Sequence, residues 1–317
     1  MSIAMLLAVT VAVAVYGPDL LRAAGVDWRS TRAGLIAVHV VVVSVLAGWL
    51  LVGVLLAAWT DDLIARPARA LALCAPIVAM SHLHTPLVTT VGIGIVALFG
   101  GWVTWRTRRE LRAVRRVAQL HTEIARMIGR PLTSGGQAVL VDARERAVYC
   151  VPGRPGTVVV SAGAREVLAD GELDAVLTHE LTHLTERHHL VLALWRGLVR
   201  SLPALPLFVW AEQQVAHLLE LRADDAAARL HGPRTVAAAL VALVRAGTAT
   251  PAGALGASGG HVRARVERLV SPAPDSYRHT LRLTGAVTVV IGAPLVAVTA
   301  TMTPLHELLM SCPLWMH

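Results

Sequence analysis

Long apolar stretches separated by polar segments are the dominant pattern along this chain. Residues 3–21, 33–59, 86–105 and 283–303 are apolar over about the length that a helix needs to cross a bilayer, roughly 20 residues. The stretch at 70–85 is also apolar, but prolines and histidines interrupt it, which favours a re-entrant or interfacial segment. The pattern therefore predicts about four transmembrane helices.

The region between the third and fourth stretches has a different periodicity. Residues 106–129 have helical spacing and continue the third stretch. After them, three β-rich runs are expected at 138–142, 146–151 and 157–161, and helices at 163–169, 172–187, 211–231, 234–247 and 261–270. The apolar segment 190–210 carries arginines and prolines, so it fits a membrane-skimming segment better than a span.

These patterns predict a mainly α membrane protein in four parts. Residues 1–105 form an N-terminal membrane region, and residues 106–282 form an α+β domain that is large enough to bury a core of its own. The fourth transmembrane helix occupies 283–303, and a short extracytoplasmic tail occupies 304–317.

Arginines indicate the orientation in the membrane. All 29 basic residues are arginines, and six of them lie in the eleven residues 106–116, directly after the third span. Because basic flanks stay in the cytoplasm, we expect a cytoplasmic domain and both termini outside. Direct binding of nucleic acid is not expected, since the run has no interleaved aromatic residues. An arginine- and alanine-rich chain without lysine is typical of GC-rich bacterial genomes, so we expect a multi-pass protein of a bacterial cell membrane.

The stretch AVLTHELTHLTERHH, residues 175–189, contains the pattern H-E-x-x-H. A helix there places His179 and His183 one turn apart on one face, where two imidazoles can share one Zn²⁺. Glu180 can then act as the general base on a metal-bound water. The scattered cysteines Cys74, Cys150 and Cys312 do not indicate a thiolate zinc site.

Catalytic zinc usually has three protein ligands, so a third is expected downstream. In ELRADD, Glu220 and Asp224 lie at i and i+4 of a second helix. Glu220 can therefore bind the metal while Asp224 holds a ligand histidine by a hydrogen bond. His188 and His189 follow too closely to turn back to the metal, and we expect them to be polar residues at the helix end.

HELTH followed by ELRAD, after VYCVPG and before VRARVERL, resembles the BlaR/MecR family of integral-membrane zinc metallopeptidases. These are gluzincins, related to the HtpX and Ste24 proteases by the H-E-x-x-H plus E-x-x-x-D pattern. The resemblance implies one Zn²⁺ bound by His179, His183 and Glu220, with Glu180 as general base and Asp224 orienting a ligand histidine. It also implies a cytoplasmic protease domain between the third and fourth spans.

The resemblance further implies an endopeptidase that cleaves a cytoplasmic or juxtamembrane protein, such as a transcriptional repressor in a signalling pathway. In the antibiotic-sensing members a penicillin-binding sensor follows the last span. Only about fourteen residues follow it here, so we do not expect β-lactam sensing through an attached domain. Homo-oligomers are possible, and the substrate and activating signal stay open.

Two further groups of residues are candidates for substrate contact. A tetrahedral oxyanion needs a donor, for which His261, Arg263, Arg265 and Arg268 are candidates; each could equally have a structural role. Pro152 suits a sheet edge, so the preceding strand can accept an extended substrate segment through Ala147, Val148, Tyr149, Cys150 and Val151.

Two other classes of protein stay open at this stage. A membrane scaffold or signalling protein could use zinc only to hold its helices together, although Glu180 argues for catalysis. A metal-handling membrane protein is suggested by His39, His82 and His84, which lie in or near the spans.

Overall fold

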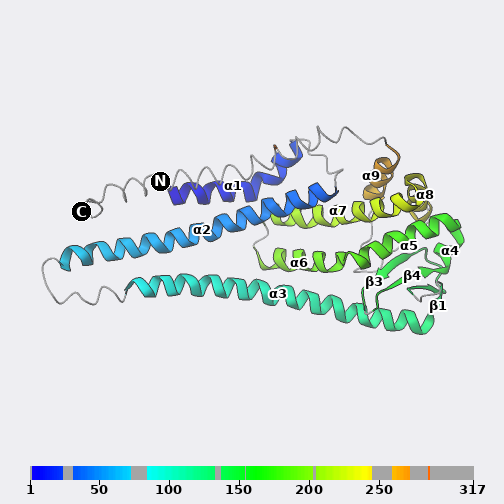
Figure 1. Cartoon of the computed structure of the whole chain (residues 1–317), viewed down its shortest axis with the longest axis horizontal. Coiled ribbons are helices and arrows are strands. Elements are labelled where there is room, and N and C mark those ends of the chain that lie inside the picture. Colours follow the sequence, from blue (N-terminus) through cyan, green and yellow to red (C-terminus); the bar gives the residue numbers. More distant parts are fainter. Residues whose placement is uncertain are drawn as a thin grey trace.

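The computed structural model describes residues 2–23, 31–72, 84–132, 137–153, 155–202, 205–244, 259–271 and 285. Three long helices run side by side: α1 (Ser2–Ala23), α2 (Thr31–Ala72) and α3 (His84–Ile128). The sheet and most of the shorter helices gather around the C-terminal end of α3, at one end of the elongated molecule (Figure 1).

The small sheet has four strands: β1 (Arg130–Pro131), β2 (Ala138–Val141), β3 (Val148–Val151) and β4 (Thr157–Ser161). Their order is β1-β2-β4-β3, with β2 parallel to β4 and β3 antiparallel to it. β4 is buried along its whole length and consists mainly of valine, which suits a central strand. β3 therefore lies at an edge of the sheet as described.

Six further helices complete the described part: α4 (Ala162–Val167), α5 (Asp170–Thr185), α6 (His188–Ser201), α7 (Pro206–His231), α8 (Pro233–Val244) and α9 (Gly259–Val270). Helix α5 begins near Glu172, whose carboxylate accepts the Ala169 N–H at 3.0 Å. It packs between α7 on one side and β3 on the other, which sets its H-E-x-x-H face against α7.

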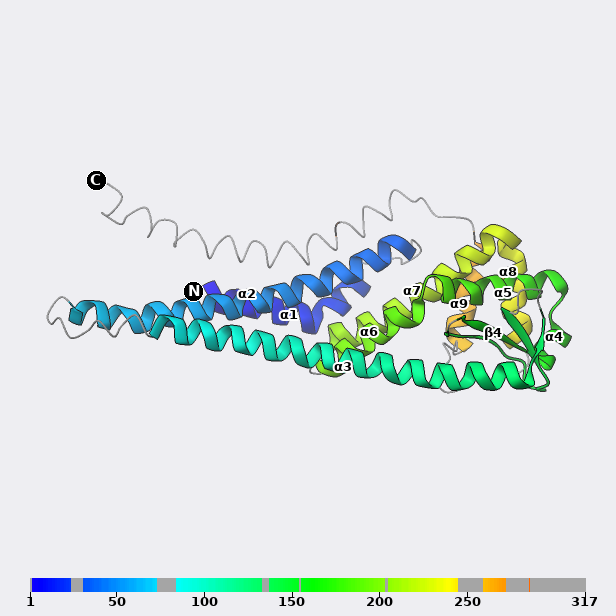
Figure 2. The same ribbon diagram turned by 60° about the horizontal axis from the view of Figure 1, so that its bottom comes forward.

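Within the segment 190–210, residues 190–201 and 206–210 are helical, which the sequence patterns did not predict. It forms α6 and the first turn of α7, and Pro206 stands at the start of α7, where a missing N–H costs little. Trp195 and Phe208 are buried in a core shared with Val13 of α1 and Val41 of α2. Tertiary packing against the N-terminal helices therefore defines this hairpin. Both views show α7 beside α2 (Figures 1 and 2).

Close helix contact also joins α6 to α3. A Cβ on Gly197 would lie 2.7 Å from the Thr107 Cα, so only glycine allows this approach. Arg200 of α6 forms an ion pair with Glu110 of α3 near the same crossing.

Within the described residues, two helical segments are long and apolar enough to cross a bilayer: Ala4–Arg22 and Thr31–Gly53. The expected third span lies in α3, which continues without interruption through the predicted helix at 106–129 as far as Ile128. The predicted fourth span and tail, at 283–303 and 304–317, lie outside the described residues except for residue 285. Most of 70–85 also lies outside them.

Candidate metal centre

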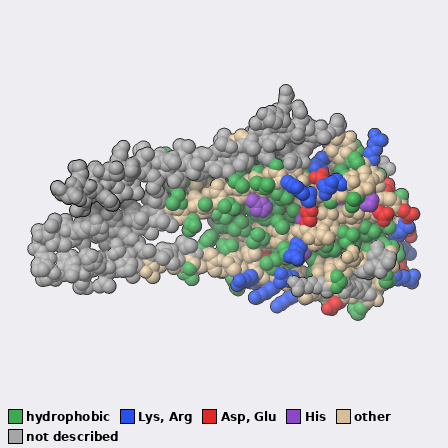
Figure 3. Space-filling view, viewed as in Figure 1, with side chains coloured by type: hydrophobic (Ala, Val, Ile, Leu, Met, Phe, Trp, Pro, Cys, Tyr) green, Lys and Arg blue, Asp and Glu red, His purple; other side chains and the backbone are tan. Residues whose placement is uncertain are grey.

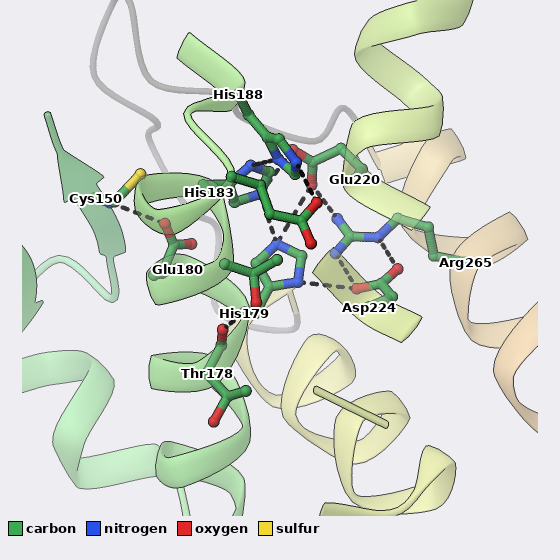
Figure 4. Close-up of polar contacts among 11 residues, drawn as sticks. Cys150, Thr178, His179, Glu180, His183, His188, Glu220, Asp224 and Arg265 are labelled. Carbon is green, nitrogen blue, oxygen red and sulfur yellow. Dashed lines mark hydrogen bonds and ion pairs between the residues drawn. The ribbon is translucent and has the colours of Figure 1, made fainter. Parts of the chain in front are cut away.

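Two helices bring the three predicted ligands together. His179 and His183 lie one turn apart on α5, and Glu220 faces them from α7 (Figure 4). The two Nε2 atoms are 3.2 Å apart, and the Glu220 carboxylate oxygens lie 3.6 Å from His179 Nε2 and 3.5 Å from His183 Nε2. One ligand atom from each residue thus lies within 4.8 Å of the others.

Asp224 holds the first histidine from the opposite side of the ring. Its Oδ1 lies 3.1 Å from His179 Nδ1, and the carboxylate is fully buried. When the Nδ1–H donates to this carboxylate, the lone pair of Nε2 is left facing the cluster. Asp224 therefore lies where the i, i+4 spacing predicted it.

Arg265, from α9, binds the carboxylates of Glu220 and Asp224 of α7. Its Nε and Nη2 donate to Asp224 at 2.7 and 2.6 Å, and its Nη1 donates to Glu220 Oε2 at 2.9 Å. Burial raises the pKa of both acids, but the bonds from Arg265 and His179 outweigh it and leave the pKa of Asp224 well below its usual range. The pKa of Glu220 falls to about 2 for the same reasons. Both groups are therefore anionic at neutral pH.

The donor set fits one Zn²⁺. Glu220 Oε1 is buried and has no hydrogen-bond partner among the described residues, although it lies beside His183 Nε2. Burial lowers the pKa of His179, but the hydrogen bonds to Asp224 and Glu220 raise it to about 9. The surroundings of the His179 ring therefore favour a positive charge. A divalent cation would supply that charge and satisfy the orphan oxygen. Two histidines and one carboxylate, with a fourth position open, are a ligand set of catalytic zinc.

Glu180 lies next to the cluster and faces the sheet. Its carboxylate accepts the Cys150 N–H from β3 at 2.8 Å (Figure 4). Burial raises the pKa of Glu180, and the charge on Glu220 raises it further. A carboxylate with a raised pKa is suited to take up and release a proton near neutral pH.

The edge strand presents part of its backbone away from the sheet. The Ala147 carbonyl accepts the Ser161 N–H at 3.0 Å, so in this antiparallel pair the alternate residues Val148 and Cys150 point their N–H and C=O groups outward. Burial raises the pKa of the Cys150 thiol strongly, so this cysteine is not suited to act as a nucleophile.

The other oxyanion candidates lie apart from the cluster. Arg263 is 84% exposed and pairs with Glu267, and Arg268 donates to Asp225 at 2.7 Å. The side chain of His261 is outside the described part. Arg265 is the described arginine candidate that reaches the cluster. Because its three nitrogens donate to Asp224 and Glu220, its position suits holding these two carboxylates rather than binding an oxyanion.

His188 lies at a helix end, as predicted, since it is the first residue of α6. The sequence did not predict that its side chain is buried, with 2% exposure, and that its Nδ1 lies 2.8 Å from His183 Nδ1. Helix α5 ends at Thr185, and Arg187 has a left-handed conformation with φ 55°, which turns the chain so that α6 begins at His188. Two adjacent histidines after the motif were the only signal in the sequence.

Comparison with known families bears on this region directly. Residues 111–246 match the family model of Peptidase family M48. The match supports assignment to the M48 metallopeptidases. This M48-like region, residues 111–246, runs from the middle of α3 through α8, and it contains the three ligands, Glu180 and Asp224. M48 peptidases are zinc-dependent, in agreement with the His179, His183 and Glu220 group.

The comparisons do not reach beyond the family. The BlaR/MecR subtype stays a prediction, and no curated protein and no solved structure matches the chain. Two apolar N-terminal helices preceding the M48-like region suggest membrane association.

Proposed function

We propose that this protein is a membrane-embedded, zinc-dependent endopeptidase with its active site between α5, α7 and β3. The observation that carries the proposal is the cluster of His179, His183 and Glu220 with Glu180 beside it, inside a region that matches M48 peptidases.

The roles of the side chains follow from their positions. When bound, Zn²⁺ would polarise a peptide carbonyl and acidify a water molecule. His179, His183 and Glu220 would hold it. Asp224 would orient His179, and Arg265 would orient Glu220. Glu180 takes the proton from the attacking water and passes it to the leaving amine, for which its raised pKa is suited.

A strand of the substrate would pair with β3. The outward N–H and C=O of Val148 and the C=O of Cys150 offer hydrogen bonds to an extended segment independent of its side chains, while the Cys150 N–H is engaged by Glu180. Because the Cys150 N–H also binds Glu180, a segment that pairs there is brought to the general base. We propose a cytoplasmic or juxtamembrane protein as substrate, and the resemblance to BlaR/MecR proteins makes a repressor in a signalling pathway a candidate.

The same side of the membrane would carry the active site and the α1–α2 connection. Thr31, at the start of α2, donates to Asp225 of α7 at 3.2 Å. On α3, Trp102 and Trp105 are exposed, and Arg106 lies 4.8 Å from the Trp102 ring centroid. Aromatic residues beside arginines are typical of the cytoplasmic membrane interface. These contacts support a cytoplasmic domain and an N-terminus that lies outside. They also support a third span that ends near Trp105.

The rival classes have less support. His39 is held between α2 and α6, since its Nδ1 lies 2.7 Å from the Leu35 carbonyl and its Nε2 accepts the Trp195 N–H at 3.3 Å. It therefore has a structural role that accounts for its presence without metal transport. A structural zinc site would have four protein ligands, whereas the described group has three and lies beside Glu180.

The test compares zinc content and casein cleavage by the purified full-length protein in detergent. We expect about one zinc in the wild type, loss of both metal and cleavage in His179→Ala, His183→Ala and Glu220→Ala, and retained metal without cleavage in Glu180→Gln. Wild-type protein without zinc, or an active Glu180→Gln, contradicts the proposal.

The inactive Glu180→Gln protein can also identify the substrate. A photocrosslinker at Ala147 or Tyr149 should capture the substrate retained by this variant. Capture from other surfaces but not from these positions contradicts pairing with β3.

A further inference from the structure

A second line of hydrogen bonds leads from the metal centre to the protein surface. His183 Nδ1 lies 2.8 Å from His188 Nδ1, and His188 Nε2 lies 3.2 Å from Glu186 Oε2. Arg222 of α7 holds the Glu186 carboxylate with two bonds, of 2.7 and 3.1 Å. Four side chains from α5, α6 and α7 and the turn between α5 and α6 are thus connected in series.

The order of donors in this series determines where the lone pairs lie. Glu186 only accepts, so His188 Nε2 carries the hydrogen that it donates to Glu186. In the neutral ring His188 Nδ1 is then an acceptor, and the facing Nδ1 of His183 must be the donor. A neutral His183 with its hydrogen on Nδ1 has its lone pair on Nε2, which faces His179 and Glu220.

The backbone supports the same interpretation. Arg187 is the one described non-glycine residue with positive φ, at 55°. A left-handed arginine costs on the order of 1 kcal/mol, and such strain persists where the surrounding structure requires it. Here it brings His188 against His183, five residues away, which continuation of the helix would not do. The side chain is then buried, with 2% exposure.

We propose that His188, held by Glu186 and Arg222, is a positioning residue that fixes the tautomer and ring orientation of His183 for metal binding. The inference rests on the proposed zinc centre and extends it. His179 and His183 would then be held by different partners: a buried carboxylate bound by Arg265 for the first, and an imidazole bound by a partly exposed carboxylate for the second.

The experiment measures zinc affinity by chelator competition in full-length protein, and the d–d absorption spectrum after loading with Co²⁺. His188→Leu removes the acceptor, and we expect about 10- to 100-fold weaker zinc binding and an altered Co²⁺ spectrum. His188→Gln keeps an acceptor within reach and should recover part of the affinity. His189→Leu is the matched control, because the His189 ring is next in the sequence but is not part of the hydrogen-bonded series. This variant should keep the wild-type zinc affinity and Co²⁺ spectrum.

Glu186→Gln and Arg222→Gln test the outer part without a change in the core. Each should weaken zinc binding less than His188→Leu does. If His188→Leu fails to fold, these two variants alone test whether the series positions His183. Wild-type zinc affinity and Co²⁺ spectrum in a folded His188→Leu, or in both outer variants, would overturn the inference while the zinc centre stands. A wild type that binds no zinc overturns both the inference and the proposed function.

Discussion

At the scale of single residues, the centre depends on charges that are buried in pairs. Asp224 is fully buried and Arg265 is 3% exposed, so each is compensated mainly by the other. Arg265 comes from α9, which lies beyond the matched residues 111–246. Helix α9 therefore completes a centre that is otherwise built by α5 and α7.

Replacement of Arg265 by methionine should destabilise the protein and weaken its zinc binding. The buried Asp224 carboxylate would lose its cationic partner, which typically costs about 3–5 kcal/mol. Thermal unfolding and chelator competition measure the two effects. Arg263→Met, on the exposed face of the same helix, should change neither. Equal behaviour of the two variants would show that Arg265 does not hold the ligands.

Glu186 gives a prediction about pH. Hydrogen bonds from Arg222 hold the pKa of Glu186 below its usual value. Because the folded pKa is the lower one, the stabilisation is present above the unfolded pKa, about 4.3, and is lost as the pH falls through the folded pKa. In metal-free protein, Glu186→Gln should lower Tm at pH 7 by on the order of 1–3 °C.

The difference in Tm should disappear only in stronger acid, once the pH lies below the lowered folded pKa of Glu186 and the wild-type carboxyl group is also neutral. Glu166→Gln, at an exposed position of α4, should leave Tm unchanged at both pH values. A Tm difference for Glu186→Gln that persists in acid would mean that the carboxyl shape matters and its charge does not.

The residue types and spacings were sufficient to predict which side chains come together in the candidate centre. The placing of His179, Glu180 and His183 follows from the stretch 172–187, which has no Gly or Pro, and that of Glu220 with Asp224 from the i, i+4 spacing. The contact of His188 with His183 was not predicted, because it depends on the left-handed conformation of Arg187, and no local sequence pattern indicates that conformation. The choice of Arg265 over Arg263 and Arg268 depends on how α9 faces α7, and this is a tertiary property.

At the scale of elements, strands and amphipathic helices were predicted better than the apolar hairpin. The three longer strands and the motif helix carry clear local patterns, and the structure has them within a few residues of the expected bounds. Segment 190–210 was interpreted as membrane-skimming, because it is apolar but carries arginines and prolines. They pack in a core shared with α1 and α2, which explains the pattern.

Gly163 shows how tightly the sheet is joined to the helices. It lies at the start of α4, and a Cβ there would be 2.2 Å from the Arg144 carbonyl oxygen in the β2–β3 turn. Gly163→Ala should displace that turn and with it β3, at a cost of about 1–3 kcal/mol in unfolding free energy. Casein cleavage should fall as well, because β3 carries the contact to Glu180.

The matched control for this variant is Gly171→Ala in α5. No atom lies within 4 Å of a Cβ at Gly171, and alanine favours a helix over glycine by up to about 1 kcal/mol. Its stability should therefore be unchanged or slightly higher. If Gly163→Ala behaves like Gly171→Ala, the β2–β3 turn is free to move and does not fix the edge strand.

At the scale of the whole molecule, the M48-like region and the N-terminal helices share one core. Leu207 and Val215 of α7 pack with Val38 of α2 and Ala14 of α1. Charged side chains gather at the end that carries the sheet, and hydrophobic ones spread over the middle of the visible face (Figure 3). Composition predicted the two kinds of region, but not that the hairpin of α6 and α7 joins them, because that contact links segments far apart in the sequence.

Orientation in the membrane can be tested by cysteine labelling in intact cells, after the three native cysteines are replaced. Asp174 is exposed on α5 in the M48-like region, and Ser81 lies in the connection that we predict to be outside. Because the arginines of 106–116 and the Thr31–Asp225 contact favour a cytoplasmic active site, Asp174→Cys should react with an impermeant maleimide only after permeabilisation. Ser81→Cys should react in intact cells. The reverse pattern would place the centre outside and exclude a cytoplasmic substrate, even if zinc binding and casein cleavage are as proposed.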